Sequence, residues 1–123
     1  MIIKESAENY LEAILSIKQA KGCVRSIDVA TDLGVSKPSV SVAMKNFREE
    51  GYITVDKDGF IDLTEKGLQI AKKVYERHQV IAEALIAMGV SEHTAYEDSC
   101  RIEHCISQET FDRLKEFLKR LEK

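Results

Sequence analysis

The sequence predicts a mostly helical protein with one small β-hairpin. Apolar residues recur at helical spacing over most of the 123 positions, and two short alternating stretches surround a turn at residues 56–59. Glycines and capping hydroxyls stand where each helix is expected to end or begin. With 44% hydrophobic residues, the chain can form one domain or two small domains that share a core.

The first two predicted helices end at glycines, and the second is short. Gly22 ends the first helix, and Gly34 ends the second, for which Ser26 is the expected N-cap. The side chains expected to face inward are Ala7, Leu11, Ile14 and Leu15 in the first helix and Ile27, Ala30 and Leu33 in the second. A tight turn at Val35 leads to the third helix.

The third predicted helix begins after Ser36 and stops at Gly51. A hydroxyl cap followed by Pro38 is a strong start signal, because proline loses no helical hydrogen bond in the first turn. Between Ser36 and Arg48 there are three cations and no acid, although the whole chain carries a net charge of −3. Two short helices joined by a turn, the second basic and lined with small side chains, indicate a helix-turn-helix.

The alternating stretches 52–55 and 60–63 predict a hairpin that would be the wing of a winged helix. We therefore expect residues 1–63 to form a DNA-binding domain. Lysines on the third helix and on the wing would meet phosphates, while hydroxyl and methyl groups would meet base edges. The candidate DNA-contacting residues are Ser36, Lys37, Pro38, Ser39, Ser41, Val42, Lys45 and Lys57.

Residues 64–123 are expected to form a second, helical region. A long helix starts at Thr64 and is closed by Gly89, and Ser91 and Ser107 are the expected caps of two further helices. The expected inward residues are Leu68, Ala71, Tyr75, His78, Ala82 and Leu85 in the long helix and Phe111, Leu114, Leu118 and Leu121 in the last.

A thiol, a carboxylate and an imidazole lie close together in residues 100–104. In a helix, positions i, i+3 and i+4 share a face, so Cys100, Glu103 and His104 would point at one spot and suit a divalent cation. Taken alone, a cysteine is more often a small buried apolar residue. His78, on the apolar stripe of its helix, would equally suit a core histidine.

The three cysteines show no spacing typical of a disulfide framework, so reduced thiols are available as ligands. Cys105 points about 100° away from His104 on a helix and is expected to pack, while Cys23 and His93 are expected at the surface. No apolar run approaches the ~20 residues that span a membrane, and the N-terminus is acidic too early for a signal peptide. We expect a cytoplasmic protein with no membrane partner.

Four motifs, in this order, resemble the metal-dependent repressors of the diphtheria toxin repressor and manganese transport regulator family. They are Asn9-Tyr10-Leu11-Glu12, Pro38-Ser39-Val40-Ser41, Leu63-Thr64-Glu65-Lys66-Gly67 and Cys100-x-x-Glu103-His104. The resemblance covers nearly the whole chain and corresponds to the short form of the family, without its SH3-like domain.

The resemblance implies a homodimer that represses transcription at a palindromic double-stranded DNA operator when a divalent metal is bound. The metal would join the first helix to the helices of the metal-binding and dimerisation region, and the regulated genes would be those of metal homeostasis. No enzymatic activity is implied. Carried onto this sequence, the implied metal ligands are Asn9, Glu12, His78, Cys100, Glu103 and His104.

Two ligand positions depart from the family's patterns. Manganese-selective members have carboxylates where this chain has Asn9 and Cys100, and iron-responsive members share the thiol but have methionine in the first helix. Fe(II) and Mn(II) are the first candidates, and a thiolate favours Fe(II), Co(II), Ni(II) or Zn(II) over Mn(II). Ala82 and Tyr96 stand where an ancillary site needs glutamate and histidine, so we expect one main site per subunit.

Three other functions fit parts of the sequence. A metal-independent winged-helix regulator could respond to a small molecule or a protein partner. A metalloenzyme could use His, Cys and Glu around zinc, but the chain has no Gly-rich phosphate loop and no His-Glu-x-x-His motif. A protein-binding winged helix would not need the acid-free stretch from Ser36 to Arg48.

Overall fold

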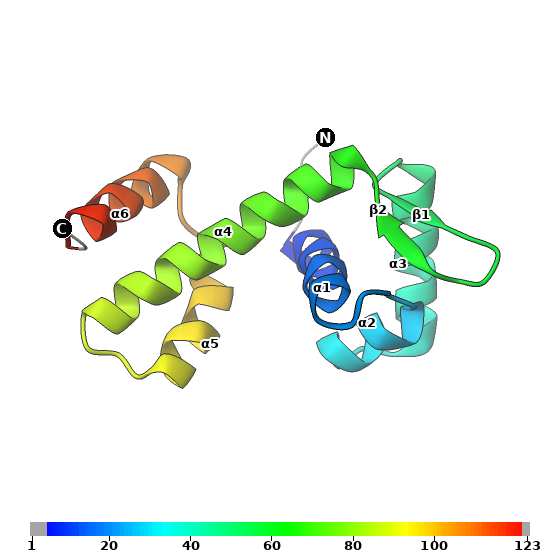
Figure 1. Ribbon diagram of the computed structural model, residues 1–123, viewed down its shortest axis with the longest axis horizontal. Coiled ribbons are helices and arrows are strands. Elements are labelled where there is room, and N and C mark those ends of the chain that lie inside the picture. Colours follow the sequence, from blue (N-terminus) through cyan, green and yellow to red (C-terminus); the bar gives the residue numbers. More distant parts are fainter. Residues whose placement is uncertain (1–4, 122–123) are drawn as a thin grey trace. The chain divides into compact units, whose positions relative to one another are not determined.

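The computed structural model describes residues 5–121. Its helices and strands within this range are α1 (Glu5–Lys21), α2 (Ser26–Leu33), α3 (Lys37–Glu49), β1 (Ile53–Val55), β2 (Ile61–Leu63), α4 (Glu65–Ala87), α5 (Glu92–Ile102) and α6 (Gln108–Leu121) (Figure 1). The predicted fold class, mostly α with one hairpin, is confirmed. The chain divides into two compact units between Lys72 and Lys73, inside α4.

The first unit is a winged helix-turn-helix. α2 contacts α1 and α3, and the hairpin contacts α1 through β2 and α3 through β1 (Figure 1). The strands are antiparallel, with Thr54 opposite Asp62. Alternation along each strand turns Ile53 and Ile61 inward. Side chains from all of these elements form one core: Leu11, Ile14, Val24, Val29, Val40, Met44, Phe47, Ile53 and Ile61.

The expected start of α3 is confirmed, whereas the expected start of α2 is wrong by one residue. Ser36 caps α3, because its Oγ accepts a hydrogen bond from the Ser39 N–H at 3.2 Å. Arg25, not Ser26, is the N-cap of α2, and its N–H donates to Asp28 Oδ2 at 2.9 Å. The Asp28 carboxylate, at the third position of the helix, therefore caps α2, where we expected the Ser26 hydroxyl to do so.

The inward face of α2 also differs from the expected one. Val29 and Ala30 are buried, but Ile27 is 48% exposed. Because Ile27 lies about 200° around the helix from Val29, the two side chains cannot face the same core. Gly34 ends the helix with φ 65°, in the left-handed region, as expected.

The start of α4 is packed tightly against the base of the wing. Thr64 Oγ1 donates to the Gly51 carbonyl at 2.6 Å and accepts from the Gly67 N–H at 3.2 Å. A Cβ placed on Gly67 would lie 2.1 Å from the Tyr52 carbonyl oxygen, so only glycine allows this approach. The first turn of α4 is thereby fixed to the first unit.

The second unit consists of the rest of α4 with α5 and α6 (Figure 1). On this part of α4 the buried residues are Val74, Ile81, Ala82 and Ala84, of which only Ala82 was expected. Tyr75, His78 and Leu85 are partly buried instead. The buried stripe of α4 is therefore displaced by about one residue from the stripe that we expected.

α6 begins as expected and is less covered than expected. Ser107 Oγ accepts a hydrogen bond from the Thr110 N–H at 3.1 Å, and Phe111 and Leu118 are buried. Leu121, expected to face inward, is 55% exposed. Ser91 precedes α5 in extended conformation, but its side chain makes no capping hydrogen bond. Within residues 5–121, no helix is both long and apolar enough to cross a membrane.

Candidate metal centre

The thiol, carboxylate and imidazole of residues 100–104 lie near one another, but not by the expected route. α5 ends at Ile102, so Cys100 lies in its last turn, while Glu103 and His104 lie in the turn that follows. Glu103 keeps helical backbone angles, φ −57° and ψ −27°, and its N–H donates to the Ser99 carbonyl at 3.0 Å. The one-helix expectation is therefore wrong in that α5 ends before Glu103 and His104.

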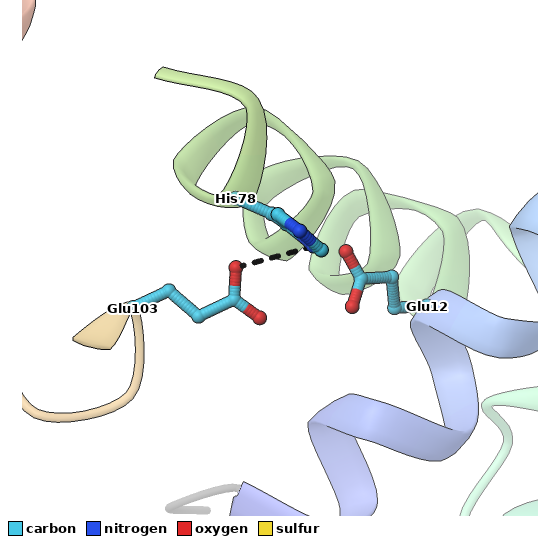
Figure 2. A group of neighbouring side chains, drawn as sticks. All are labelled: Glu12, His78 and Glu103. Atoms are coloured by element: carbon cyan, nitrogen blue, oxygen red, sulfur yellow. Dashed lines mark ion pairs between the residues drawn. The ribbon is translucent and has the colours of Figure 1, made fainter. Parts of the chain in front are cut away.

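His78, from the middle of α4, faces these residues. Its ring nitrogens lie 3.4 and 3.6 Å from the Cys100 Sγ, and its Nδ1 lies 3.8 Å from Glu103 Oε2. Figure 2 shows the His78 and Glu103 side chains pointing toward each other, with this ion pair dashed. The Glu103 Oε1 lies 3.2 Å from the His104 Nε2. Four of the six implied ligands thus form one cluster within the second unit.

Three of the four cluster side chains are largely buried, whereas Cys100 is exposed. The side chains of Glu103 and His104 are only 1% and 3% exposed, and that of His78 is 16% exposed. Burying a carboxylate costs free energy unless positive charge or hydrogen-bond donors compensate it. One sulfur, one carboxylate and two imidazoles form a donor set typical of borderline divalent transition metals. The residues present therefore fit the metal that the family resemblance implies.

Three residues that lie beside the cluster were not predicted from the sequence to belong to a site. The Tyr96 ring lies 5.8 Å from the His78 ring, and the buried Ser99 donates its hydroxyl to the Tyr96 carbonyl at 2.9 Å. Arg77 hydrogen-bonds to the carbonyl of Ile106 at 2.9 Å. The i, i+4 spacing of Tyr96 and Cys100 could have indicated a shared face. Nothing in the spacing of Arg77 indicates its partner.

Asn9 and Glu12 belong to α1 of the first unit and are described there. They lie one turn apart, so they share a face of the helix, and both are partly buried. Glu12 is also labelled in Figure 2, on α1.

All eight candidate DNA-contacting residues are exposed. They are Ser36, Lys37, Pro38, Ser39, Ser41, Val42, Lys45 and Lys57. The Ser36 hydroxyl donates to the Ser39 Oγ at 2.8 Å, which orders two of the hydroxyls at the start of α3. The exposed Ile27, missed because it was placed in the core, lines a hollow of about 270 Å³ with Ser26, Lys37, Val40 and Ser41.

The remaining cysteines and histidine carry no site. Cys23 and His93 are exposed, as expected. Cys105 is exposed as well, so the expectation that it packs is wrong, because the turn after Ile102 directs it outward.

A winged helix-turn-helix whose second helix, α3, is basic and exposed, joined to a helical unit with clustered sulfur, nitrogen and oxygen donors, defines a metal-responsive DNA-binding regulator. The comparisons with known proteins agree. The family description "Iron dependent repressor, N-terminal DNA binding domain" matches residues 3–60, and "Iron dependent repressor, metal binding and dimerisation domain" matches residues 64–123. The chain belongs to this family, which is that of the diphtheria toxin repressor and MntR.

Individual relatives match over most of the chain. An uncharacterised HTH-type transcriptional regulator of Methanocaldococcus jannaschii is 34% identical over 96% of both chains. The transcriptional regulator MntR of Salmonella typhimurium is 34% identical over 93% of this chain and 73% of MntR. The solved structure of the manganese regulator SloR is 27% identical, with a TM-score of 0.79 over 97% of this chain and 55% of SloR. The chain thus spans about half the length of SloR.

These matches confirm the resemblance drawn from the four motifs. The chain is a metal-responsive transcriptional repressor with the family's DNA-binding domain followed by its metal-binding and dimerisation domain. Its partners are double-stranded DNA and a second copy of itself.

Proposed function

We propose that this repressor silences metal-homeostasis genes in the cytoplasm when Fe(II) or Mn(II) is plentiful, and that it has no enzymatic activity. The observation that carries the proposal is the cluster of His78, Cys100, Glu103 and His104 in the second unit, with the Glu103 and His104 side chains buried. We assign DNA reading to residues 1–63 and metal binding with dimerisation to residues 64–123. A palindromic operator follows from a two-fold symmetric dimer.

We propose six metal ligands: Asn9, Glu12, His78, Cys100, Glu103 and His104. The last four are supported by their mutual distances, and Asn9 and Glu12 by family membership and their shared helix face. Ligands from both regions of the chain would let the ion act on the DNA-binding arrangement as well as on local stability.

The donor set favours Fe(II) over Mn(II). The family is named for iron, and the relative SloR is a manganese regulator, so both ions have precedent among similar proteins. Cys100 offers a thiolate, which binds softer or borderline ions better than Mn(II). Asn9 offers a neutral amide oxygen, so the site has less negative charge than one with two carboxylates in α1.

A bound divalent ion would supply positive charge to the buried Glu103 carboxylate. The chain's own residues hold their donor atoms close together, so little reordering is needed when the ion arrives. For the ion to act as a switch, it must bind the DNA-competent arrangement more tightly than the alternatives. A difference of about 3 kcal/mol shifts that equilibrium roughly 150-fold.

DNA contact is proposed through the exposed faces of α3 and the wing. Lys37, Lys45 and Lys57 would neutralise phosphates, and the small side chains of α3 would let the helix lie close in the major groove. Each neutralised phosphate adds about 0.9 to the slope of log K against log salt. Replacing one of these lysines by alanine should lower that slope by about one and should weaken binding to all DNA sequences alike.

The decisive experiment compares operator binding with metal and with chelator. A duplex is selected from a randomised library with Mn(II)-loaded protein, and again anaerobically with Fe(II)-loaded protein. Its affinity is then measured by fluorescence anisotropy with each ion and with EDTA. We expect binding at least about 100-fold tighter with metal. Equal affinity in both conditions would refute the metal switch and leave DNA binding intact.

A matched pair of variants separates the cluster from general effects of lost charge. In one, Cys100→Ala and Glu103→Ala remove two proposed ligands. In the other, His93→Ala and Glu97→Ala remove an exposed pair of the same helix, whose His93 Nε2 and Glu97 Oε1 lie 3.3 Å apart. Only the first variant should lose the metal response. If it keeps that response, a metal-independent regulator that answers to a small molecule or protein partner becomes the better account.

A further inference from the structure

Arg77 precedes the proposed ligand His78 on α4 and reaches across to the turn that carries two other proposed ligands. Its Nη2 donates to the Ile106 carbonyl at 2.9 Å and, more weakly, to the Ser107 carbonyl at 3.5 Å. Its guanidinium carbon lies 5.3 Å from the centre of the Phe111 ring. All of these residues belong to the second unit.

Residues 103–107 form what we call the ligand turn, and the two ends of this turn are held differently. At its start, the Glu103 N–H donates to the Ser99 carbonyl at 3.0 Å and the Cys105 N–H donates to the Ile102 carbonyl at 2.9 Å. Local backbone hydrogen bonds of α5 therefore fix this end. At the other end, Arg77 holds the carbonyls of the turn's last two residues from a different helix.

The position of Arg77 gives α4 two roles at the cluster. α4 supplies the His78 imidazole directly, and one residue earlier it fixes the turn that supplies Glu103 and His104. Arg77 also touches α6, because Ser107 caps that helix and Phe111 lies in its first turn. Arginine suits this task, since one guanidinium nitrogen reaches both carbonyls while the guanidinium plane lies near an aromatic ring.

We propose that Arg77 is a positioning residue of the metal centre: it holds the ligand turn at the distance from His78 that metal binding requires. The proposal rests on the proposed ligand set. Removing a group that orients the metal ligands typically lowers metal affinity by about 10- to 100-fold. The Arg77 Nε is buried and has no hydrogen-bond partner among residues 5–121. A contact that served only to join α4 and α6 could avoid that cost with apolar side chains.

The competing explanation is that Arg77 merely joins α4 to α6. The chain offers a control for this, because Lys115 of α6 pairs with Glu76 of α4 at 2.5 Å, one residue before Arg77. That pair joins the same two helices but is more exposed, and its Lys115 ammonium bonds to Glu76 of α4 and not to a carbonyl of the ligand turn. Lys115→Met and Arg77→Met therefore remove one α4–α6 contact each, and only the second releases the turn.

The test is anaerobic titration of the full-length protein with Co(II), monitored by the thiolate-to-cobalt absorption band. We expect Arg77→Met to raise the Kd for Co(II) by about 10- to 100-fold and to weaken the band, and Lys115→Met to leave both within threefold. In the metal-free protein, hydrogen exchange should speed up in residues 103–111 of Arg77→Met more than in Lys115→Met. Arg77→Lys, which keeps the charge but lacks the guanidinium group, should also weaken Co(II) binding at least threefold.

Several results would overturn the proposal. One is a Kd for Arg77→Met within threefold of the unmodified chain, and another is an equal loss in Lys115→Met. If Arg77→Met does not fold, Arg77→Lys is used instead, and a Kd for Co(II) within threefold of the unmodified chain would overturn the proposal. Failure of the unmodified chain to bind Co(II) at all would instead count against the proposed ligand set, which keeps the two failures apart.

Discussion

The DNA-reading face and the metal cluster are built in opposite ways. Every candidate DNA-contacting residue is exposed, and the order of that face comes from the backbone of a capped helix. In the cluster the two histidines and Glu103 are largely buried and their donor atoms lie close together, with Glu103 only 1% exposed. A surface that meets a large duplex needs a rigid scaffold, whereas an ion needs donor atoms that are already gathered and shielded from water.

This difference predicts how each region tolerates change. Substitutions on the exposed face should alter affinity for DNA and leave folding nearly unchanged, because surface side chains contribute little to stability. Substitutions in the cluster should alter metal binding and stability together, because buried polar groups depend on their partners.

The largest effect is expected from Glu103→Gln. The amide keeps the shape of the buried side chain but removes the negative charge that a cation needs. Metal affinity should therefore fall more than about 100-fold, beyond what the loss of a residue that only orients the ligands causes. Anaerobic Co(II) titration measures this. Glu97→Gln, on the exposed face of α5, is the control and should bind normally. A fall smaller than tenfold would show that Glu103 is not a ligand.

A smaller effect is expected from Cys100→Asp, which tests ion choice rather than binding itself. Replacing the thiolate by a carboxylate should raise the affinity for Mn(II) relative to Co(II) by about tenfold, because hard oxygen donors suit Mn(II). Competition between the two ions, read by the cobalt absorption spectrum and by bound manganese, gives the ratio. An unchanged ratio of the Mn(II) and Co(II) affinities would show that the Cys100 thiol does not determine ion selectivity.

On the DNA-reading face, Val42→Ala sharpens the comparison. Val42 is 62% exposed on α3 and has no hydrogen-bonding group, so a thymine methyl is its natural contact in the major groove. We expect about fivefold weaker operator binding, equivalent to about 1 kcal/mol. Replacing the contacted thymine by uracil should weaken the unmodified protein similarly and the variant hardly at all. Equal uracil effects in both proteins would exclude the contact.

The smallest effect is expected from Asp28→Ala in α2. The hydrogen bond from Lys21, and then that from the Arg25 N–H, lower the pKa of Asp28 below its ordinary 3.8. A lowered folded-state pKa gives stability that is present above the ordinary pKa and lost as pH falls through the folded value. At pH 7 the variant should lose about 0.5–1 kcal/mol of unfolding free energy, as for a lost cap.

Urea unfolding of both proteins at pH 7 and under acid conditions measures the Asp28 effect. The difference between them should shrink as the carboxyl becomes protonated. A difference that does not depend on pH would mean that side-chain packing, and not the charge of Asp28, is responsible.

Much of the fold could be predicted because its boundaries are local. Gly34 and Gly89 adopt positive φ where helices end, and Ser36 caps α3 through its own side chain. The inward faces were less predictable. Ile27 and Val29 are both apolar, and only packing against the other helices decides which of them is buried.

The residues of the candidate site could be predicted better than the backbone structure that positions them. Spacing placed Cys100, Glu103 and His104 together, and it could not show that the helix ends at Ile102. Helix ends are the least determined feature of a sequence, because the last turn has few local hydrogen bonds to fix it. Nothing in the sequence distinguishes Arg77 from other charged residues, since its partner is a backbone carbonyl 29 positions away.

Gly67 has a consequence for anyone who would engineer this protein. Glycine inside a helix lowers helix stability by about 1 kcal/mol relative to alanine, so Gly67 looks like a standard target for thermostabilisation. Here the added methyl would collide with the Tyr52 carbonyl, a backbone atom that cannot turn aside. A consensus or helix-propensity redesign that replaced it would separate α4 from the wing, and Gly67 should therefore be left unchanged in any stabilised version.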